Sequence, residues 1–154
     1  MQIEVAQQVA APRERVFDFY TDYAGWPRWA GVKEVVLRQR GDPPPNGLGA
    51  IRVVRAGGMA IEEEVTAFER PARMGYRLIA GAPIRDHGGE VRFEPDGAGT
   101  RVVWTVRFRP LVPGTGWLVR SLLERGIRSA LKGLAEHAPG ARGAAQAQTQ
   151  AADQ

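Results

Sequence analysis

One long amphipathic helix at the end of a strand-rich chain is the feature that most limits how this sequence can fold. Residues 115–137 carry apolar side chains at the i, i+3, i+4, i+7 spacing of a helix, from Val119 to Leu134. The preceding residues 32–108 read as short strands separated by turn signals. A sheet of that length with one sizeable helix must curl around the helix to bury its apolar face.

The turn signals favour antiparallel pairing, because Gly57-Gly58 and the tetrapeptide 96–99 are typical of tight hairpins. Residues 2–9 predict a further strand, and residues 11–29 predict two short helical pieces rich in aromatic side chains. We therefore predict a single α+β domain in which about seven antiparallel strands grip the C-terminal helix and enclose an apolar cavity.

The domain is predicted to cover residues 1–138. Residues 139–154 are rich in Ala and Gln and have almost nothing to bury, so this tail is predicted to be disordered.

Composition excludes several classes of function. The chain has no cysteine and only two histidines, His87 and His137, which lie far apart, so we expect no metal site and no cofactor. The net charge is +4, but the arginines are interleaved with acids, which argues against nucleic-acid binding. Apolar runs are too short to cross a bilayer, and the N-terminus does not resemble a signal peptide, so the expected location is the cytoplasm.

Four segments carry a resemblance to a known family. They are Ala11-Pro12-Arg13-Glu14-Arg15-Val16-Phe17-Asp18, the aromatic stretch from Tyr23 to Trp29, Phe68-Glu69-Arg70-Pro71-Ala72-Arg73, and Gly99-Thr100-Arg101-Val102-Val103-Trp104. With the order of elements, they resemble the SRPBCC superfamily (START/Bet v 1-like, the helix-grip fold), and within it the polyketide cyclase/dehydrase-like group. The resemblance implies lipid and sterol carriers, hormone receptors or aromatase/cyclases, and does not choose among them.

Hairpin pairing assigns side chains to the two faces of the sheet, since directly opposed residues share a face. The more apolar face, taken as the concave one, also receives three ionisable residues: Arg52, Glu63 and His87. The predicted pairs on this face are Val54 with Ile61, Arg52 with Glu63, Val65 with Tyr76, Glu63 with Leu78, Phe93 with Val102, Val91 with Trp104, Gly89 with Val106, and His87 with Phe108.

The inward Arg52 and Glu63 have two interpretations. The pair orients a polar end of a ligand or polarises a ketone, or it satisfies itself as a structural ion pair. His87 is either a general acid or base or a partly exposed, inert side chain. The predicted ligand-binding residues are Tyr20, Tyr23, Trp26, Trp29, Val54, Ile61, Val65, Tyr76, Leu78, Val91, Trp104, Val106, Phe108 and Leu122, of which Trp26 and Trp29 are expected at the mouth.

Three functions remain open at this point. The first is binding of a hydrophobic or amphipathic small molecule, lipid or polyketide-like, without changing it. The second is an aromatase/cyclase-type enzyme in which Arg52 holds a carbonyl while Glu63 or His87 moves protons. The third is a membrane-associated carrier whose helix presents basic residues to anionic headgroups, namely Arg120, Arg125, Arg128 and Lys132. The chain is expected to be a monomer or a homodimer.

Overall fold

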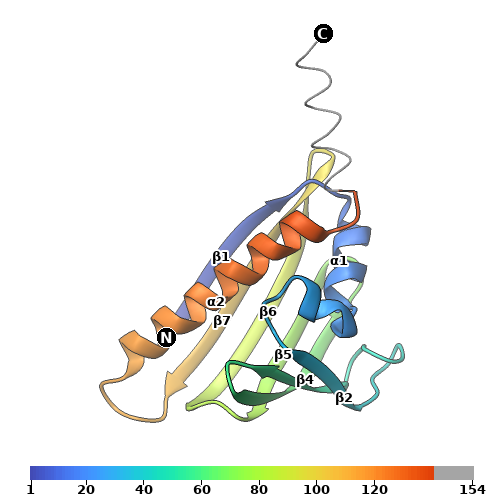
Figure 1. The fold of residues 1–154 in the computed structure, drawn as a ribbon. Coiled ribbons are helices and arrows are strands. Elements are labelled where there is room, and N and C mark those ends of the chain that lie inside the picture. Colours follow the sequence, from blue (N-terminus) through green and yellow to red (C-terminus); the bar gives the residue numbers. More distant parts are fainter. Residues whose placement is uncertain (141–154) are drawn as a thin grey trace.

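A computed structural model describes residues 1–140 of the chain and confirms the predicted helix-grip architecture (Figure 1). A curved sheet of seven strands holds a long C-terminal helix against its concave side. The elements in chain order are β1 (Gln2–Val9), α1 (Arg13–Thr21), the 3-10 helix η1 (Tyr23–Arg28), β2 (Glu34–Gln39), β3 (Ile51–Ala56), β4 (Met59–Glu69), β5 (Arg73–Ala80), β6 (Ile84–Asp96), β7 (Gly99–Pro110) and α2 (Gly116–His137).

The strands follow the order β1-β7-β6-β5-β4-β3-β2, and all neighbours are antiparallel. Strands β2 to β7 form a meander, and its last strand, β7, pairs with the N-terminal strand β1. The helices α1 and η1 connect β1 to β2 and lie on the same side of the sheet as α2 (Figure 1). One face of the sheet is therefore covered by helices and the other faces solvent.

The predicted strand registers are confirmed at nearly every hairpin. Arg52 lies opposite Glu63 and Val54 opposite Ile61, as the two-glycine turn required. The pairs of Val65 with Tyr76 and of Val91 with Trp104 are also present, and so are the other predicted pairs of these hairpins. The faces assigned from the sequence are thus correct along β3 to β7.

One predicted pair, His87 with Phe108, falls in an irregular part of the β6–β7 ladder and is not a regular register pair. A β-bulge shifts the register between Arg85 and Gly88, and Asp86 within it adopts a positive φ of 50°. The bulge inserts one extra residue on β6, so that Asp86 and His87 together lie opposite Phe108, and it changes the direction of the side chains next to it. Asp86 is a residue type that tolerates this left-handed conformation, but nothing in the period of the strand pattern announced the shift.

The helix α2 is buried along its C-terminal half only. Ile127, Leu131 and Leu134 are buried against the sheet, and α2 contacts β1 and β7. Gly133 permits a close approach to the end of η1, because a Cβ there would lie 2.0 Å from the carbonyl oxygen of Trp29. The C-terminal half is therefore clamped between the sheet and η1.

The N-terminal half of α2 is much more open. Trp117 and Leu122 have 71% and 58% of their surface exposed, while Val119 and Leu123 are half-buried. Leu122, expected inside the cavity, thus points mainly to solvent. The apolar stripe that predicted the helix is wider than the surface the sheet covers.

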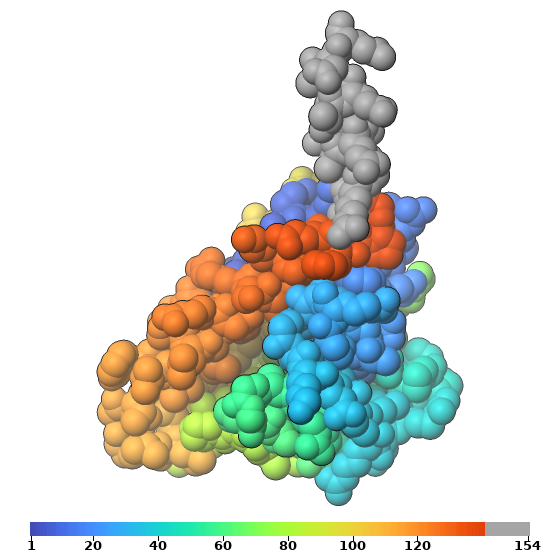
Figure 2. Space-filling model, viewed as in Figure 1, coloured from blue at the N-terminus to red at the C-terminus, as the bar shows by residue number. Residues whose placement is uncertain are grey.

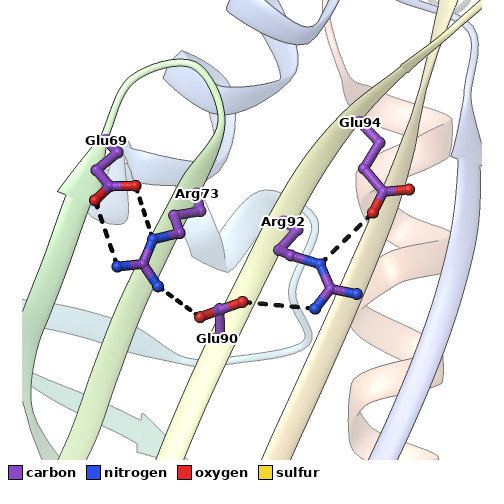
Figure 3. Close-up of polar contacts among 5 residues, drawn as sticks. All are labelled: Glu69, Arg73, Glu90, Arg92 and Glu94. Carbon is purple, nitrogen blue, oxygen red and sulfur yellow. Dashed lines mark hydrogen bonds and ion pairs between the residues drawn. The ribbon is translucent and has the colours of Figure 1, made fainter.

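The outer face of the sheet is charged, as predicted from the strand pairing. Arg73 bridges Glu69 and Glu90, and Arg92 bridges Glu90 and Glu94, in one chain of ion pairs (Figure 3). These side chains are largely solvent-exposed, so the ion pairs contribute little to stability. The chain of pairs marks this face as a solvated surface.

Among residues 1–140, no helix is long and apolar enough to cross a membrane. The predicted tail covers residues 139–154, and all of it after Gly140 lies outside the described residues.

Candidate functional site

The centre of the site is a buried ion pair on the concave face. Arg52 in β3 is completely buried, and Glu63, directly opposite in β4, is 9% exposed. The Nε atom of Arg52 donates to Oε1 of Glu63 at 3.4 Å, the long end of the hydrogen-bond range. The two predicted inward charges therefore meet through a single weak contact.

Three aromatic rings enclose the guanidinium of Arg52. Its central carbon lies 4.5 Å from the ring centre of Tyr23, 4.6 Å from that of Trp26 and 5.0 Å from that of Tyr76. Cation–π contacts at these distances stabilise a charge held away from water. They do not satisfy its N–H groups, and Nη1 and Nη2 have no hydrogen-bond partner among the described residues.

Burial and charge act in opposite directions on this pair. Burial raises the pKa of Glu63 above the ordinary glutamate value, and the nearby Arg52 offsets only part of that rise. Burial lowers the pKa of Arg52, but the carboxylate of Glu63 and the surrounding tyrosines outweigh it and raise the pKa overall. Arg52 is therefore charged, and Glu63 is the group that can take up a proton.

The aromatic residues of α1 and η1 form a packed cluster around this pair. Tyr20 lies 5.5 Å from Trp26 and 6.0 Å from Trp29 between ring centres, and Trp26 donates its Nε1–H to the carbonyl of Tyr20 at 2.7 Å. Trp26 and Trp29 are each only 5% exposed, so their expected position at an exposed mouth is wrong. The close approach of α2 at Gly133 covers this segment, which sequence alone did not reveal.

Two side chains of this cluster retain unsatisfied polar atoms. The hydroxyl of Tyr20 and the indole N–H of Trp29 are buried without a hydrogen-bond partner within residues 1–140. Burial raises the pKa of the Tyr20 hydroxyl well above its usual value, against the opposing effect of Arg52. Tyr20 therefore stays a neutral hydroxyl that can donate or accept.

Tyr76 joins the buried pair to the neighbouring strands. Its hydroxyl accepts a hydrogen bond from Nε1 of Trp104 at 2.8 Å. Its ring lies over Gly89, where a Cβ would be only 2.3 Å from Cζ of Tyr76. Sequence reasoning placed Gly89 opposite Val106 but missed its contact with Tyr76, although a glycine inside a strand pattern signals such a close approach.

His87 has a structural contact that explains its orientation. Its Nδ1 accepts the backbone N–H of Leu78 at 3.0 Å, beyond the last β5–β6 pair, Tyr76 with Gly89. Burial lowers the pKa of His87 to about 4, so the ring is neutral at neutral pH with its proton on Nε2. The ring also lies 5.4 Å from that of Tyr76, which therefore contacts both His87 and Arg52.

The predicted apolar lining divides into a packed part and a partly open part. Val65, Val91, Val106 and Phe108 are at most 2% exposed and belong to the filled core. Val54, Tyr76 and Trp104 are also buried, with 5–8% of their surface exposed, and only Ile61 and Leu78 are half-buried. Figure 2 shows a hollow between α2, η1 and the β3–β4 hairpin, with strands of the sheet at its floor. We call this hollow the recess.

Within the described residues, no group of three or more His, Cys, Asp or Glu side chains is placed to hold a metal ion. The chemistry that the site offers is therefore that of a buried cation with two available N–H donors, a carboxyl of raised pKa and a neutral tyrosine hydroxyl beside apolar surface.

Comparisons with known proteins place this geometry in context. The profile of a family described as "Polyketide cyclase / dehydrase and lipid transport" matches residues 1–139. An uncharacterized protein of Mycobacterium tuberculosis is 30% identical over 135 residues, covering 82% of this chain and 77% of the relative.

Two solved structures share the fold. A START superfamily protein from Mycobacterium smegmatis has a TM-score of 0.76 at 16% identity, covering 89% of this chain and 96% of that one. The di-domain ARO/CYC BexL from the BE-7585A biosynthetic pathway has a TM-score of 0.73 at 23% identity, covering 90% of this chain and 50% of that one. At these identities, the likeness concerns the fold.

Proposed function

Because the chain belongs to the polyketide cyclase/dehydrase and lipid transport family, we propose that it binds an amphipathic small molecule in the recess, with the polar end of that molecule at Arg52. The family and the fold support binding of hydrophobic ligands in general. The residues around Arg52 support the finer statement that the ligand is polar at one end.

The observation that carries the proposal is a buried guanidinium with two unpartnered nitrogens, Nη1 and Nη2 of Arg52. Leaving a buried donor without an acceptor costs about 1–3 kcal/mol, and more for a charged group. Buried polar atoms without partners are uncommon in native proteins and call for an ordered water, an ion or a ligand. An acceptor oxygen carried on an apolar molecule would satisfy these donors and cover the adjoining apolar surface.

The charge balance of the site favours a neutral acceptor, such as a ketone or ester oxygen. Glu63 already neutralises Arg52, so a second carboxylate would leave a net negative charge in a buried site, which is costly. A carboxylate ligand requires Glu63 to take up a proton, which its raised pKa makes easier. Fatty acids should therefore bind more tightly as the pH falls, whereas neutral ketones should not.

The apolar part of the ligand would lie against the partly open residues of the concave face. Val54, Ile61, Leu78 and Trp104 offer aliphatic and aromatic surface there. Tyr76 is buried with its ring 5.0 Å from the guanidinium, and its side chain would contact both Arg52 and the apolar part of a ligand. Burial of apolar surface contributes about 25 cal/mol per Å², which supplies most of the affinity.

A second candidate function is catalysis on a carbonyl compound of the polyketide type. It is favoured by one observation, a carboxyl of raised pKa beside a charged guanidinium. Arg52 would polarise a ketone while Glu63 exchanges a proton with the adjacent carbon. His87 is a weaker candidate for the base, because its Nδ1 is occupied by the N–H of Leu78.

This second function is tested by cyclisation of a test poly-ketone in Glu63→Gln. Loss of cyclisation with ligand binding retained would support it. Cyclisation that survives the substitution would exclude Glu63 as the proton-transfer group.

Ligand binding in the recess is tested by displacement of a fluorescent apolar probe. Leu78→Trp should fill the recess and weaken probe binding, whereas Ile79→Trp should not, since Ile79 is the next residue of β5 and is exposed. Urea unfolding checks that both variants fold. Probe binding that is absent in the wild type, or equally weakened in both folded variants, would contradict the proposal.

A further inference from the structure

Five apolar side chains lie exposed at the start of α2 and in the loop before it. They are Leu111, Val112, Trp117, Leu118 and Leu122, each with 45–71% of its surface exposed. We call them the apolar edge. In the described part of the chain this segment runs from the end of β7 along the half of α2 that the sheet leaves uncovered (Figure 1). Exposed apolar surface of this kind marks an interaction site more often than chance.

The residues around the apolar edge are strongly basic. Between Leu111 and Lys132 the sequence has four arginine and lysine residues against one acid, Glu124, whereas the whole chain has a net charge of only +4. All four basic residues lie on α2 and are exposed: Arg120, Arg125, Arg128 and Lys132. Glu124 pairs with Arg120 at 3.9 Å and with Arg128 at 2.7 Å, so Arg125 and Lys132 are the two basic residues of this set without an ion pair in the described part of the chain.

The helical spacing joins the apolar and basic side chains into one stripe. Leu118, Leu122 and Arg125 follow one another at i, i+4 and i+7, and Lys132 continues the line two turns further on. Trp117 lies on the neighbouring line, where Arg120 follows it at i+3 and Arg128 lies three turns further along the helix. A helix with Trp and Leu at one end and Arg and Lys beside them suits the boundary between lipid chains and headgroups.

We propose that the apolar edge docks on a bilayer that contains anionic phospholipid. Trp117 and the leucines insert at the level of the headgroups, where tryptophan is enriched in membrane proteins, and Arg125 and Lys132 contact phosphate groups. The partner is a membrane rather than a second copy of the chain, because a two-fold contact through this surface would bring its four cations against four more. Charge complementarity therefore selects the anionic surface.

Docking in this orientation would bring the recess next to the membrane. The half-buried Val119 and Leu123 lie on the same half of α2 as the apolar edge. A ligand could then pass between the membrane and the recess without crossing much water. The membrane contact itself does not depend on the ligand site, so its test is separate from that of the proposed function.

The test uses the full chain with vesicles of phosphatidylcholine alone and of an equal mixture with phosphatidylglycerol. Co-sedimentation should occur with the anionic vesicles, decrease with added salt, and be weak with phosphatidylcholine. Tryptophan emission should shift to shorter wavelength on binding, because Trp117 is highly exposed while Trp26, Trp29 and Trp104 are already buried. Failure to bind anionic vesicles, or binding indifferent to lipid charge, would overturn the proposal.

Matched variants distinguish binding through this surface from non-specific hydrophobic adsorption and from the effect of net charge. Trp117→Ser with Leu118→Ser should weaken vesicle binding about tenfold or more, while Val36→Ser with Leu48→Ser, at exposed apolar positions elsewhere, should not. The double variant Arg125→Glu/Lys132→Glu should weaken vesicle binding roughly tenfold or more. The control Arg40→Glu/Arg101→Glu makes the same change in net charge at exposed positions elsewhere and should have a smaller effect.

Two outcomes would replace the proposal with another. A concentration-dependent dimer that Trp117→Ser abolishes, together with no vesicle binding, would identify a second copy as the occupant. Equal losses in test and control variants would show that net charge, and not this surface, drives association.

Discussion

Arg52 and Glu63 face each other directly across β3 and β4, yet they touch only through Nε and Oε1, 3.4 Å apart. A bidentate arrangement would use two parallel N–H groups and satisfy the carboxylate fully. Instead both Nη atoms are held among aromatic rings without an acceptor. This incomplete pairing distinguishes a site prepared for a polar group from a self-sufficient ion pair.

Removing one partner of the buried pair should destabilise the fold strongly, whereas replacing both partners should change the free energy of unfolding little. Arg52→Met leaves Glu63 buried without a counter-charge and should lower the free energy of unfolding by about 3–5 kcal/mol near neutral pH. Arg52→Met with Glu63→Leu removes both charges and should lie within about 1 kcal/mol of the wild type or above it. Urea unfolding measures both. A double variant as unstable as the single one would show that the pair is a structural requirement of the fold.

Gly89 should tolerate no side chain. A Cβ there would collide with the ring of Tyr76, so Gly89→Ala should destabilise by about 1–3 kcal/mol and displace that ring. The matched control is Gly88→Ala, where the nearest atom is Nη2 of Arg107 at 3.9 Å and the change should stay within about 0.5 kcal/mol. Thermal unfolding of both variants checks this, and equal effects would contradict the packing described.

Tyr76 and Tyr20 should respond oppositely to loss of the hydroxyl. Tyr76→Phe leaves the buried N–H of Trp104 without its acceptor and should cost about 1–3 kcal/mol. Tyr20→Phe removes a hydroxyl that has no partner and should leave the ligand-free protein equally stable or more stable by up to about 1 kcal/mol. If Tyr20 also contacts the ligand, its substitution should weaken binding. A large loss of stability in Tyr20→Phe would argue against an unsatisfied hydroxyl.

His87 should make stability depend on pH in a defined window. Its folded pKa of about 4 lies below the ordinary value of 6.5, so the unfolded chain binds more protons between these values. The contribution of His87 is therefore complete above pH 6.5 and is lost as the pH falls toward 4, where protonation also breaks the bond from Leu78. The difference in unfolding free energy between wild type and His87→Gln, measured across this window, should shrink on acidification. A constant difference would contradict the lowered pKa.

Local sequence signals predicted the sheet well because tight turns determine register. The glycines 57 and 58 and the turn at 96–99 were enough to place Arg52 opposite Glu63 and Val91 opposite Trp104. The bulge beside His87 was not predictable, because it interrupts the strand period without a turn residue that announces it.

The burial of the tryptophans and the uncovered half of α2 were missed for a different reason. Both depend on where one element rests on another: Gly133 brings α2 against Trp29, and the sheet does not extend under Leu122. Periodicity identifies an apolar stripe but not the length of the surface that will cover it. The recess and the apolar edge are therefore tertiary features.

Arg52 is proposed to bind a neutral acceptor at the end of an apolar molecule, and a comparison of two ligands that differ only in this acceptor tests the proposal. The dissociation constants of a long-chain methyl ketone and of the alkane of the same length are measured with the wild type and with Arg52→Met/Glu63→Leu. A hydrogen bond to a charged group should favour the ketone by roughly 10- to 100-fold in the wild type, and this preference should disappear in the double variant. Equal affinities for ketone and alkane in the wild type, or a preference that survives the loss of Arg52, would contradict the account.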